Sequence, residues 1–174
     1  ICENILKKNR KIIKNHVLNE GYEASKTFFE KGIGSKLIIN NKSYYDLSFS
    51  AGSLLLGHQS KIFKKAFQNL INDKITVMAA PNRQAINYSN LLKKIFPHYN
   101  KFIFCSTGSE AVMKALRISK AITKKSLIIS VTGSWHGSND KTLFSADKNF
   151  NAFPISSGLS KYDKSKIKFI PYNN

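Results

Sequence analysis

The sequence has few arginines, few acidic residues, two cysteines and one tryptophan. Of its 28 basic residues only Arg10, Arg83 and Arg117 are arginine, and 10 acidic residues leave a formal net charge of +18. Such a charge suggests a nucleic-acid-binding domain. Proteins that read nucleic acids rely on arginine for bidentate contacts, however, and here the lysines are spread along the whole chain. We therefore attribute the charge to a compositional bias and expect no nucleic-acid partner.

Cysteines and long apolar runs are also scarce. Cys2 and Cys105 lie far apart, and such a pair predicts neither a disulfide framework nor a metal site, which favours a reducing cytoplasm. No apolar run approaches the length of a membrane span, and the lysine-rich start lacks the apolar core of a signal peptide. We therefore expect a cytoplasmic protein with no membrane association and no metal.

The sequence does have enough apolar residues, 42% of 174, to build one domain with a core. It begins at Ile1 without a methionine and ends just after a predicted strand, so we expect it to be a fragment.

The most informative stretch begins at residue 102. Residues 102–105 form an apolar run without alternation, which predicts a strand buried on both faces. A helix should follow at once, because Thr107 and Glu110 have the spacing of a capping box, in which Glu110 bonds back to the N–H of the cap residue. The first N–H groups of this helix, at Gly108 and Ser109, would then point outward beside the hydroxyls of Thr107 and Ser109. This arrangement predicts a site for a phosphate or another anion.

A second buried strand is predicted at residues 127–131, followed by a loop, Gly-Ser-Trp-His-Gly at 133–137, that holds the only tryptophan. In a parallel sheet both loops would lie at the carboxyl ends of their strands, where such folds bind ligands. Together they suit a flat, phosphorylated cofactor. A strand followed by a capped helix is also common in any α/β protein, and one glycine is a weaker signal than a glycine-rich loop. The local pattern alone leaves both interpretations open.

These motifs resemble the cofactor-binding core of class III aminotransferases. The similar segments are Ser-Thr-Gly-Ser-Glu-Ala-Val-Met-Lys-Ala-Leu-Arg-Ile-Ser-Lys-Ala at 106–121 and Gly-Ser-Trp-His-Gly-Ser at 133–138. Segments 46–58 and 170–173 fit the same family in the same order. Within the family, the chain most resembles the glutamate-1-semialdehyde aminomutase branch.

The resemblance implies an α/β fold, the fold-type I architecture of pyridoxal-phosphate-dependent transferases. Residues 1–50 would be an N-terminal helix and hairpin segment, and residues 51–174 the first, incomplete part of the large cofactor-binding domain.

The resemblance also implies the residues of the site. Thr107, Gly108 and Ser109 would bind the phosphate of pyridoxal 5'-phosphate, Trp135 would stack on its pyridine ring, and His136 would line the same pocket. The family usually has Tyr or Phe in place of Trp135, and the larger ring should still stack. The family's catalytic lysine, and the aspartate that pairs with the pyridine nitrogen, have no counterpart in this chain, so no residue receives a catalytic role.

The function implied is transfer of an amino group between an amino donor and a carbonyl compound, or its shift within one substrate, by a homodimeric full-length enzyme. The chain alone should be inactive. Two alternatives stay open: a non-catalytic α/β module that binds another phosphorylated ligand, and a basic nucleic-acid-binding domain.

The remaining segments predict packing elements. His58 is interpreted as a structural residue, and Asp140 as a loop residue that makes structural hydrogen bonds. The pattern of apolar and turn residues predicts a surface helix within residues 1–20, a hairpin with strands at 36–39 and 44–49, a helix capped by Ser60 and a helix ending before Pro97. It also predicts a functional surface loop or partial disorder at 138–161 and a strand at 166–170.

Overall fold

The computed structural model describes residue 29 and residues 31–75 and 80–173, and the helix predicted within residues 1–20 lies outside them. The chain divides into two compact units, Ile1–Asn82 and Arg83–Asn174.

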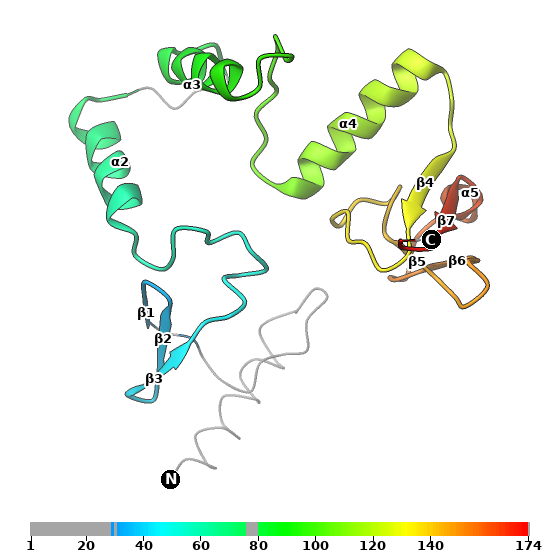
Figure 1. The fold of residues 1–174 in the computed structure, drawn as a ribbon, viewed down its shortest axis with the longest axis horizontal. Helices are drawn as coiled ribbons and strands as arrows, with labels where there is room; N and C mark the ends of the chain where they lie inside the picture. Colours follow the sequence, from blue (N-terminus) through cyan, green and yellow to red (C-terminus); the bar gives the residue numbers. More distant parts are fainter. Residues whose placement is uncertain (1–28, 30, 76–79, 174) are drawn as a thin grey trace. The chain divides into compact units, whose positions relative to one another are not determined.

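The described part of the first unit begins with a three-stranded antiparallel sheet. Its strands are β1 (Lys31–Ile33), β2 (Lys36–Ile39) and β3 (Lys42–Tyr45), in that order (Figure 1). The predicted hairpin is confirmed, but its second strand starts and ends earlier than predicted, because Asn40 and Asn41 alone form the turn. Both have positive φ, 48° and 61°, as two-residue turns that match the twist of the strands require.

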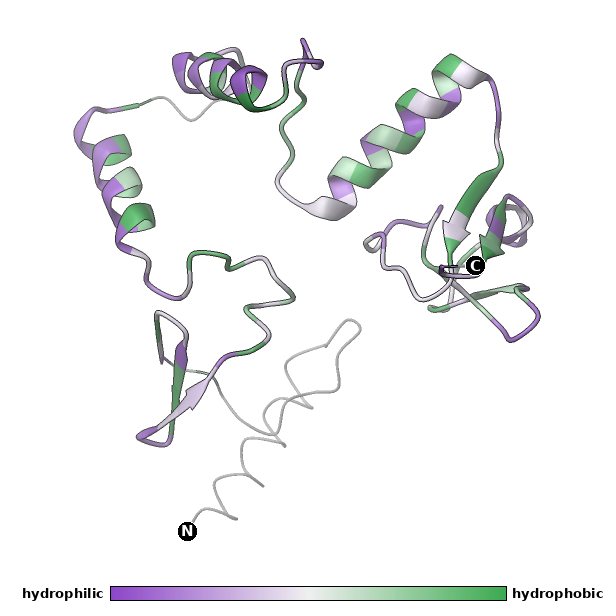
Figure 2. Ribbon diagram, viewed as in Figure 1, coloured by the Kyte–Doolittle hydropathy of each residue, from purple (hydrophilic) through white to green (hydrophobic). Residues whose placement is uncertain are grey.

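The helix α2 (Lys61–Asn72) completes the described part of this unit. Ser60 caps it as predicted, since its Oγ accepts the N–H of Ile62 at 3.3 Å. Hydrophobic residues lie along one side of the helix (Figure 2), yet none of them is buried, and Phe67 is 62% exposed. The described residues therefore leave the apolar side of α2 uncovered.

Two helices open the second unit, α3 (Arg83–Ile95) and α4 (Gly108–Thr123). Between them, residues 102–105 form no strand, so that prediction is wrong. The physical reason is the lack of a partner, because no described strand pairs with this run. Ile103 is 61% exposed, and the one described ring that stacks on Phe104 is that of Tyr88, with 5.4 Å between the ring centroids.

The strands of the second unit form two small sheets. β4 (Ile128–Val131) pairs in parallel with β7 (Ile167–Ile170), which confirms both predicted strands to within one residue. β5 (Phe144–Ala146) and β6 (Ala152–Pro154) pair antiparallel, and α5 (Lys161–Ser165) precedes β7. The prediction that residues 138–161 form a surface loop is therefore wrong.

A small apolar core explains this correction. Phe144 of β5 is 3% exposed and packs in one cluster with Ile167 and Phe169 of β7, which alternate along their strand with exposed residues. Ile128, Ala146, Ala152 and Leu159 pack against this cluster. The burial of Phe144 thus holds the β5–β6 hairpin against the parallel pair.

Candidate functional site

The start of α4 has the geometry that the capping pattern predicts. Thr107 is the cap residue, and its Oγ1 accepts the N–H of Glu110 at 3.1 Å. The carboxylate of Glu110 does reach back, but it accepts the N–H of Ser106, at 2.9 Å, and not that of Thr107 as predicted. Thr107 itself has the extended backbone that is typical of a helix cap (φ −141°, ψ 158°).

Several hydrogen-bond donors remain unpaired at this helix end. Within the described residues, the N–H groups of Gly108 and Ser109 have no acceptor, and a Cβ built on Gly108 would meet nothing within 4 Å. The hydroxyls of Thr107 and Ser109 serve as acceptors, so each keeps its proton for another partner. Four donors beside open space at the positive end of a helix form a receptor for an oxyanion.

Glu110 is the one negative charge at this helix end, and a cation neutralises it. Its Oε1 lies 2.6 Å from Lys114 Nζ, one turn along the helix. This bond, together with the N–H of Ser106, lowers the pKa of Glu110 below its ordinary value, and the same pair raises the pKa of Lys114. Glu110 therefore stays paired with Lys114, which limits its repulsion of an anion at Gly108.

A contact 29 residues apart in sequence joins this helix end to the loop after β4. The N–H of Ser138 donates to Ser109 Oγ at 3.0 Å. Gly137, with φ of 86°, makes the approach possible, because a Cβ there would lie 2.6 Å from Ser109 Cα. The structure thus brings the predicted anion site and the predicted aromatic loop together.

Trp135 and His136 occupy this loop in different ways. Trp135 is 65% exposed, and no aromatic ring of the described residues stacks on it. His136 is half-buried, and its Nε2 lies within hydrogen-bond distance of the hydroxyls of Ser130 and Ser134. The site therefore has an exposed aromatic ring, that of Trp135, beside an imidazole whose Nε2 is already hydrogen-bonded.

The turn after this loop is held by Asn139 and Lys141. Asn139 Nδ2 donates to Thr142 Oγ1 at 2.7 Å, and Lys141 Nζ lies 2.6 Å from the buried carboxylate of Asp163. That ion pair is the main reason why the pKa of Asp163 lies below its ordinary value. Among the described residues no hydrogen bond of the Asp140 side chain is found, and the neighbouring Asn139 makes the hydrogen bond to Thr142 in this turn.

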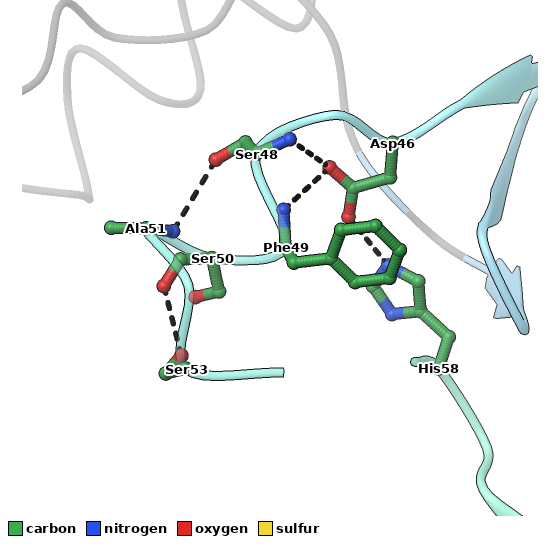
Figure 3. A network of polar contacts seen from close by, with 7 residues as sticks. All are labelled: Asp46, Ser48, Phe49, Ser50, Ala51, Ser53 and His58. Carbon is green, nitrogen blue, oxygen red and sulfur yellow. Dashed lines mark hydrogen bonds and ion pairs between the residues drawn. The ribbon is translucent and has the colours of Figure 1, made fainter. Parts of the chain in front are cut away.

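A second polar network lies in the first unit, around the buried carboxylate of Asp46 (Figure 3). Asp46 Oδ1 accepts the N–H groups of Ser48 and Phe49, each at 2.9 Å, and Oδ2 lies 2.7 Å from His58 Nε2. The bond to His58, then the N–H of Phe49, lower the pKa of Asp46 below its ordinary value. His58 is thus a structural partner, as predicted.

This network encloses a strained turn. Phe49, Ser50 and Ala51 have φ of 44°, 53° and 55°, and Gly52 follows with φ of 83°. Each non-glycine residue in the left-handed region costs roughly 1–2 kcal/mol, so such a run persists only where its surroundings enforce it. Asp46 and His58 hold the two ends of the segment, and Figure 3 shows the ring of Phe49 beside that of His58.

Comparison with known proteins identifies the family of this chain. The sequence model described as Aminotransferase class-III matches residues 17–174, which is most of the chain. The chain belongs to the class III aminotransferases. Members of this family are enzymes, and the predicted resemblance is confirmed.

Among curated members of the family, the chain is 34% identical over 150 residues to a glutamate-1-semialdehyde 2,1-aminomutase of Thermodesulfovibrio yellowstonii. It is 31% identical over 148 residues to the glutamate-1-semialdehyde 2,1-aminomutase of Archaeoglobus fulgidus. These alignments cover 84% and 83% of the chain but 35% of each relative. The chain thus spans about a third of the length of the curated class III relatives that it matches.

Solved structures agree on the fold. An omega-transaminase from Sphaerobacter thermophilus matches 99% of the chain with a TM-score of 0.78 and 20% identity, over 42% of its own length. A glutamate-1-semialdehyde aminomutase from Pseudomonas aeruginosa PAO1 matches 98% with a TM-score of 0.73 and 12% identity, over 38% of its length. The predicted fold class, the α/β fold of fold-type I transaminases, is confirmed.

Two further findings concern what the described residues lack. None of their helices is long and apolar enough to cross a membrane. Over the same ranges, no group of three or more His, Cys, Asp or Glu side chains is placed to bind a metal ion.

Sequence reasoning missed the residues that assemble the site of this class III chain. Ser130, Ser134 and Ser138 each make a hydrogen bond there, and Gly137 allows the close approach to Ser109. A signal for Gly137 was present, because a glycine directly after an aromatic-His pair indicates a turn or a close backbone contact. The serines carried none, since their partners are defined only by the folded loop.

Proposed function

We propose that the protein containing this chain is a pyridoxal-phosphate-dependent enzyme that transfers an amino group between an amino donor and a carbonyl compound, or shifts it within one substrate. Membership of the class III family supports this proposal. The observation that carries it is the contact between Ser138 and Ser109, which joins an anion receptor to a loop with an exposed tryptophan.

The residues fit the cofactor by their donors and by the space beside them. Thr107, Gly108 and Ser109 would bind the phosphate through the two free N–H groups and two hydroxyl protons at the start of α4. Trp135 would cover one face of the pyridine ring, and His136 would line the same pocket. These roles require no rearrangement of the described hydrogen bonds, since the donors involved are unpaired.

When bound, pyridoxal phosphate supplies a ring that draws electrons from the bond being broken at the substrate. The part of this chain is to bind and orient that ring. The amino exchange and the proton transfers need a lysine for which no residue of this chain is a counterpart. We therefore expect the 174-residue chain by itself to show no transaminase turnover, and turnover by the purified chain would refute this.

The whole protein's organisation is proposed on the same basis. Residues 1–50 would form an arm and residues 51–174 the first part of the large domain. The exposed apolar side chains of Ile103 and Phe104 support the idea that residues 102–105 become a strand when neighbouring strands from the rest of the protein are present. We also propose a cytoplasmic homodimer that acts on small amino and carbonyl compounds.

The proposal is tested by titrating the intact protein with pyridoxal phosphate while absorbance and tryptophan fluorescence are recorded. We expect binding to quench the fluorescence of Trp135, so the quenching should disappear in Trp135→Phe while binding persists. Ser109→Ala should weaken binding, because it removes one hydroxyl donor and the acceptor of the Ser138 N–H. A matched control is Ser119→Ala, which changes an exposed serine of the same helix whose side chain makes no recorded contact.

Two results would favour other functions. Equal affinity for inorganic phosphate and pyridoxal phosphate, without quenching of Trp135, would indicate a module that binds another phosphorylated ligand. Binding of nucleic acid that falls steeply with salt and is unchanged in Trp135→Ala would indicate a nucleic-acid-binding domain.

A further inference from the structure

Two serine hydroxyls hold the ring of His136 at the end of β4. His136 Nε2 lies 2.9 Å from Ser134 Oγ and 3.1 Å from Ser130 Oγ. Ser130 is buried, with 4% of its surface exposed, and its hydroxyl lies 3.3 Å from Ser134 Oγ. These three residues form a serine–histidine cluster in which each group can both donate and accept.

A contact to the backbone decides where the protons of this cluster lie. Ser134 Oγ is 2.5 Å from the carbonyl oxygen of Val131, which has no proton to give, so the Ser134 hydroxyl must donate. A hydroxyl has one proton, and Ser134 Oγ therefore acts only as an acceptor toward its other neighbours. It follows that His136 Nε2 is protonated and donates to Ser134 Oγ.

Ser130, like His136, donates its proton to Ser134 Oγ. Because Nε2 already bears a proton, Ser130 cannot donate to it, and its hydroxyl donates to the second lone pair of Ser134 Oγ. In a neutral imidazole with Nε2 protonated, Nδ1 is a bare acceptor. Across residues 31–75 and 80–173, no hydrogen bond is recorded to His136 Nδ1.

We propose that Ser130 and Ser134 are positioning residues that fix His136 as the Nε2–H tautomer, so that Nδ1 accepts a hydrogen bond from a hydroxyl or ammonium group of the bound ligand. The identity of that ligand rests on the proposed function. The anion and the donor group are thereby recognised by different elements. The start of α4 binds the anion, and His136 binds a donor, because a bare nitrogen repels an oxyanion.

The test is nitrogen NMR of the intact protein labelled with 15N-histidine, at about pH 8, above the ordinary pKa of histidine. The signals of His136 are assigned by their loss in His136→Gln. We expect Nε2 to bear a proton that exchanges slowly with water and Nδ1 to give the signal of an unprotonated nitrogen. Ser134→Ala should speed that exchange by roughly two- to twelvefold, the range expected for one lost hydrogen bond.

Two variants separate positioning from a general structural effect. Ser134→Thr keeps the hydroxyl and should restore slow exchange. Ser138→Ala changes a serine of the same loop whose hydroxyl makes no recorded bond, and it should leave the signals of His136 unchanged. If Ser134→Ala does not fold, the protonation of the two ring nitrogens of His136 in the unchanged protein still decides, because a proton on Nδ1 contradicts the proposal.

The proposal is overturned if Nδ1 bears the proton in the unchanged protein, or if exchange is the same in Ser134→Ala as in the unchanged protein. The measurement needs no cofactor. A failure of pyridoxal phosphate binding would therefore leave this result standing, and the two outcomes are distinguishable.

Discussion

The described part of the second unit has a buried apolar cluster, and that of the first unit has none. In the second unit, Phe144, Ile167 and Phe169 are buried together, and two sheets meet over them. In the first unit, the buried side chain is the carboxylate of Asp46, which bonds to the backbone of a turn and to His58. The packing of apolar side chains requires no particular orientation, whereas hydrogen bonds to a carboxylate require particular angles between donor and acceptor. The hydrogen bonds of Asp46 therefore hold the strained turn at 49–52 in place.

The largest expected effect comes from emptying the apolar core. Phe144→Ala should lower the free energy of unfolding by about 3–5 kcal/mol, because it removes a buried ring and leaves a cavity. Urea unfolding of the intact protein measures this. Phe153→Ala is the matched control, since Phe153 lies on the neighbouring strand β6 but is 44% exposed. Equal losses in the two variants would mean that burial of Phe144 is not what holds the second unit.

A pair of glycine substitutions tests the contact between α4 and the loop. Gly133→Ala and Gly137→Ala both place a side chain at positive φ, 78° and 86°, and each should cost roughly 1–2 kcal/mol of unfolding free energy. Only Gly137→Ala also pushes the loop from Ser109, because the space around Gly133 is open.

Pyridoxal phosphate affinity should separate these two variants. We expect Gly137→Ala to bind at least about tenfold more weakly than Gly133→Ala, a difference of about 1.4 kcal/mol. The same titration used for Trp135 measures it. Equal affinities would show that the Ser109–Ser138 contact does not shape the binding site.

The carboxylate network of the first unit should respond to acid, unlike the apolar core. The folded-state pKa of Asp46 lies below its ordinary value of 3.8, so its stabilisation is present above pH 3.8 and is lost as the pH falls through the lowered pKa. Asp46→Asn should remove this acid-dependent loss and should already be less stable at neutral pH. The measurement is the unfolding midpoint as a function of pH.

Asp73→Asn is the matched control for this acid response. Asp73 is exposed at the end of α2, and its side chain makes no recorded hydrogen bond in the described residues, so the control should keep the acid response of the unchanged protein. An unchanged acid response in Asp46→Asn would place its origin elsewhere.

The smallest effect is expected at the hairpin turn. Asn41 has φ of 61°, a conformation that glycine adopts without steric cost, and Asn-Gly is the preferred pair in such turns. Asn41→Gly should raise the unfolding free energy by about 0.5 kcal/mol, whereas Asn41→Ala should lower it. Thermal unfolding of the two variants gives the sign, and a gain in Asn41→Ala would contradict the assigned turn.

Features set by neighbouring residues could be predicted from the sequence. Thr107, Ser60 and the two asparagines of the hairpin act through contacts within a few positions, so their spacing identifies α4, α2 and the turn. The resemblance of residues 106–121 and 133–138 to the class III family was equally local.

Features set by distant partners could not be predicted. Residues 102–105 have the composition of a buried strand, but pairing depends on neighbours that the described residues do not supply. The β5–β6 hairpin depends on Phe144 meeting β7, and the site depends on Ser138 meeting Ser109. None of these contacts leaves a periodic pattern in the sequence.

The close approach at Gly137 has a consequence for how this protein tolerates genetic change. Glycine is the only amino acid without a Cβ, so every missense mutation of codon 137 adds at least one carbon where Ser109 Cα is 2.6 Å away. Codon 133 has no such neighbour, and short side chains there meet only the cost of the backbone angle. Two glycines that look alike in the printed sequence therefore differ in whether a replacement collides with a neighbouring residue in addition to straining the backbone.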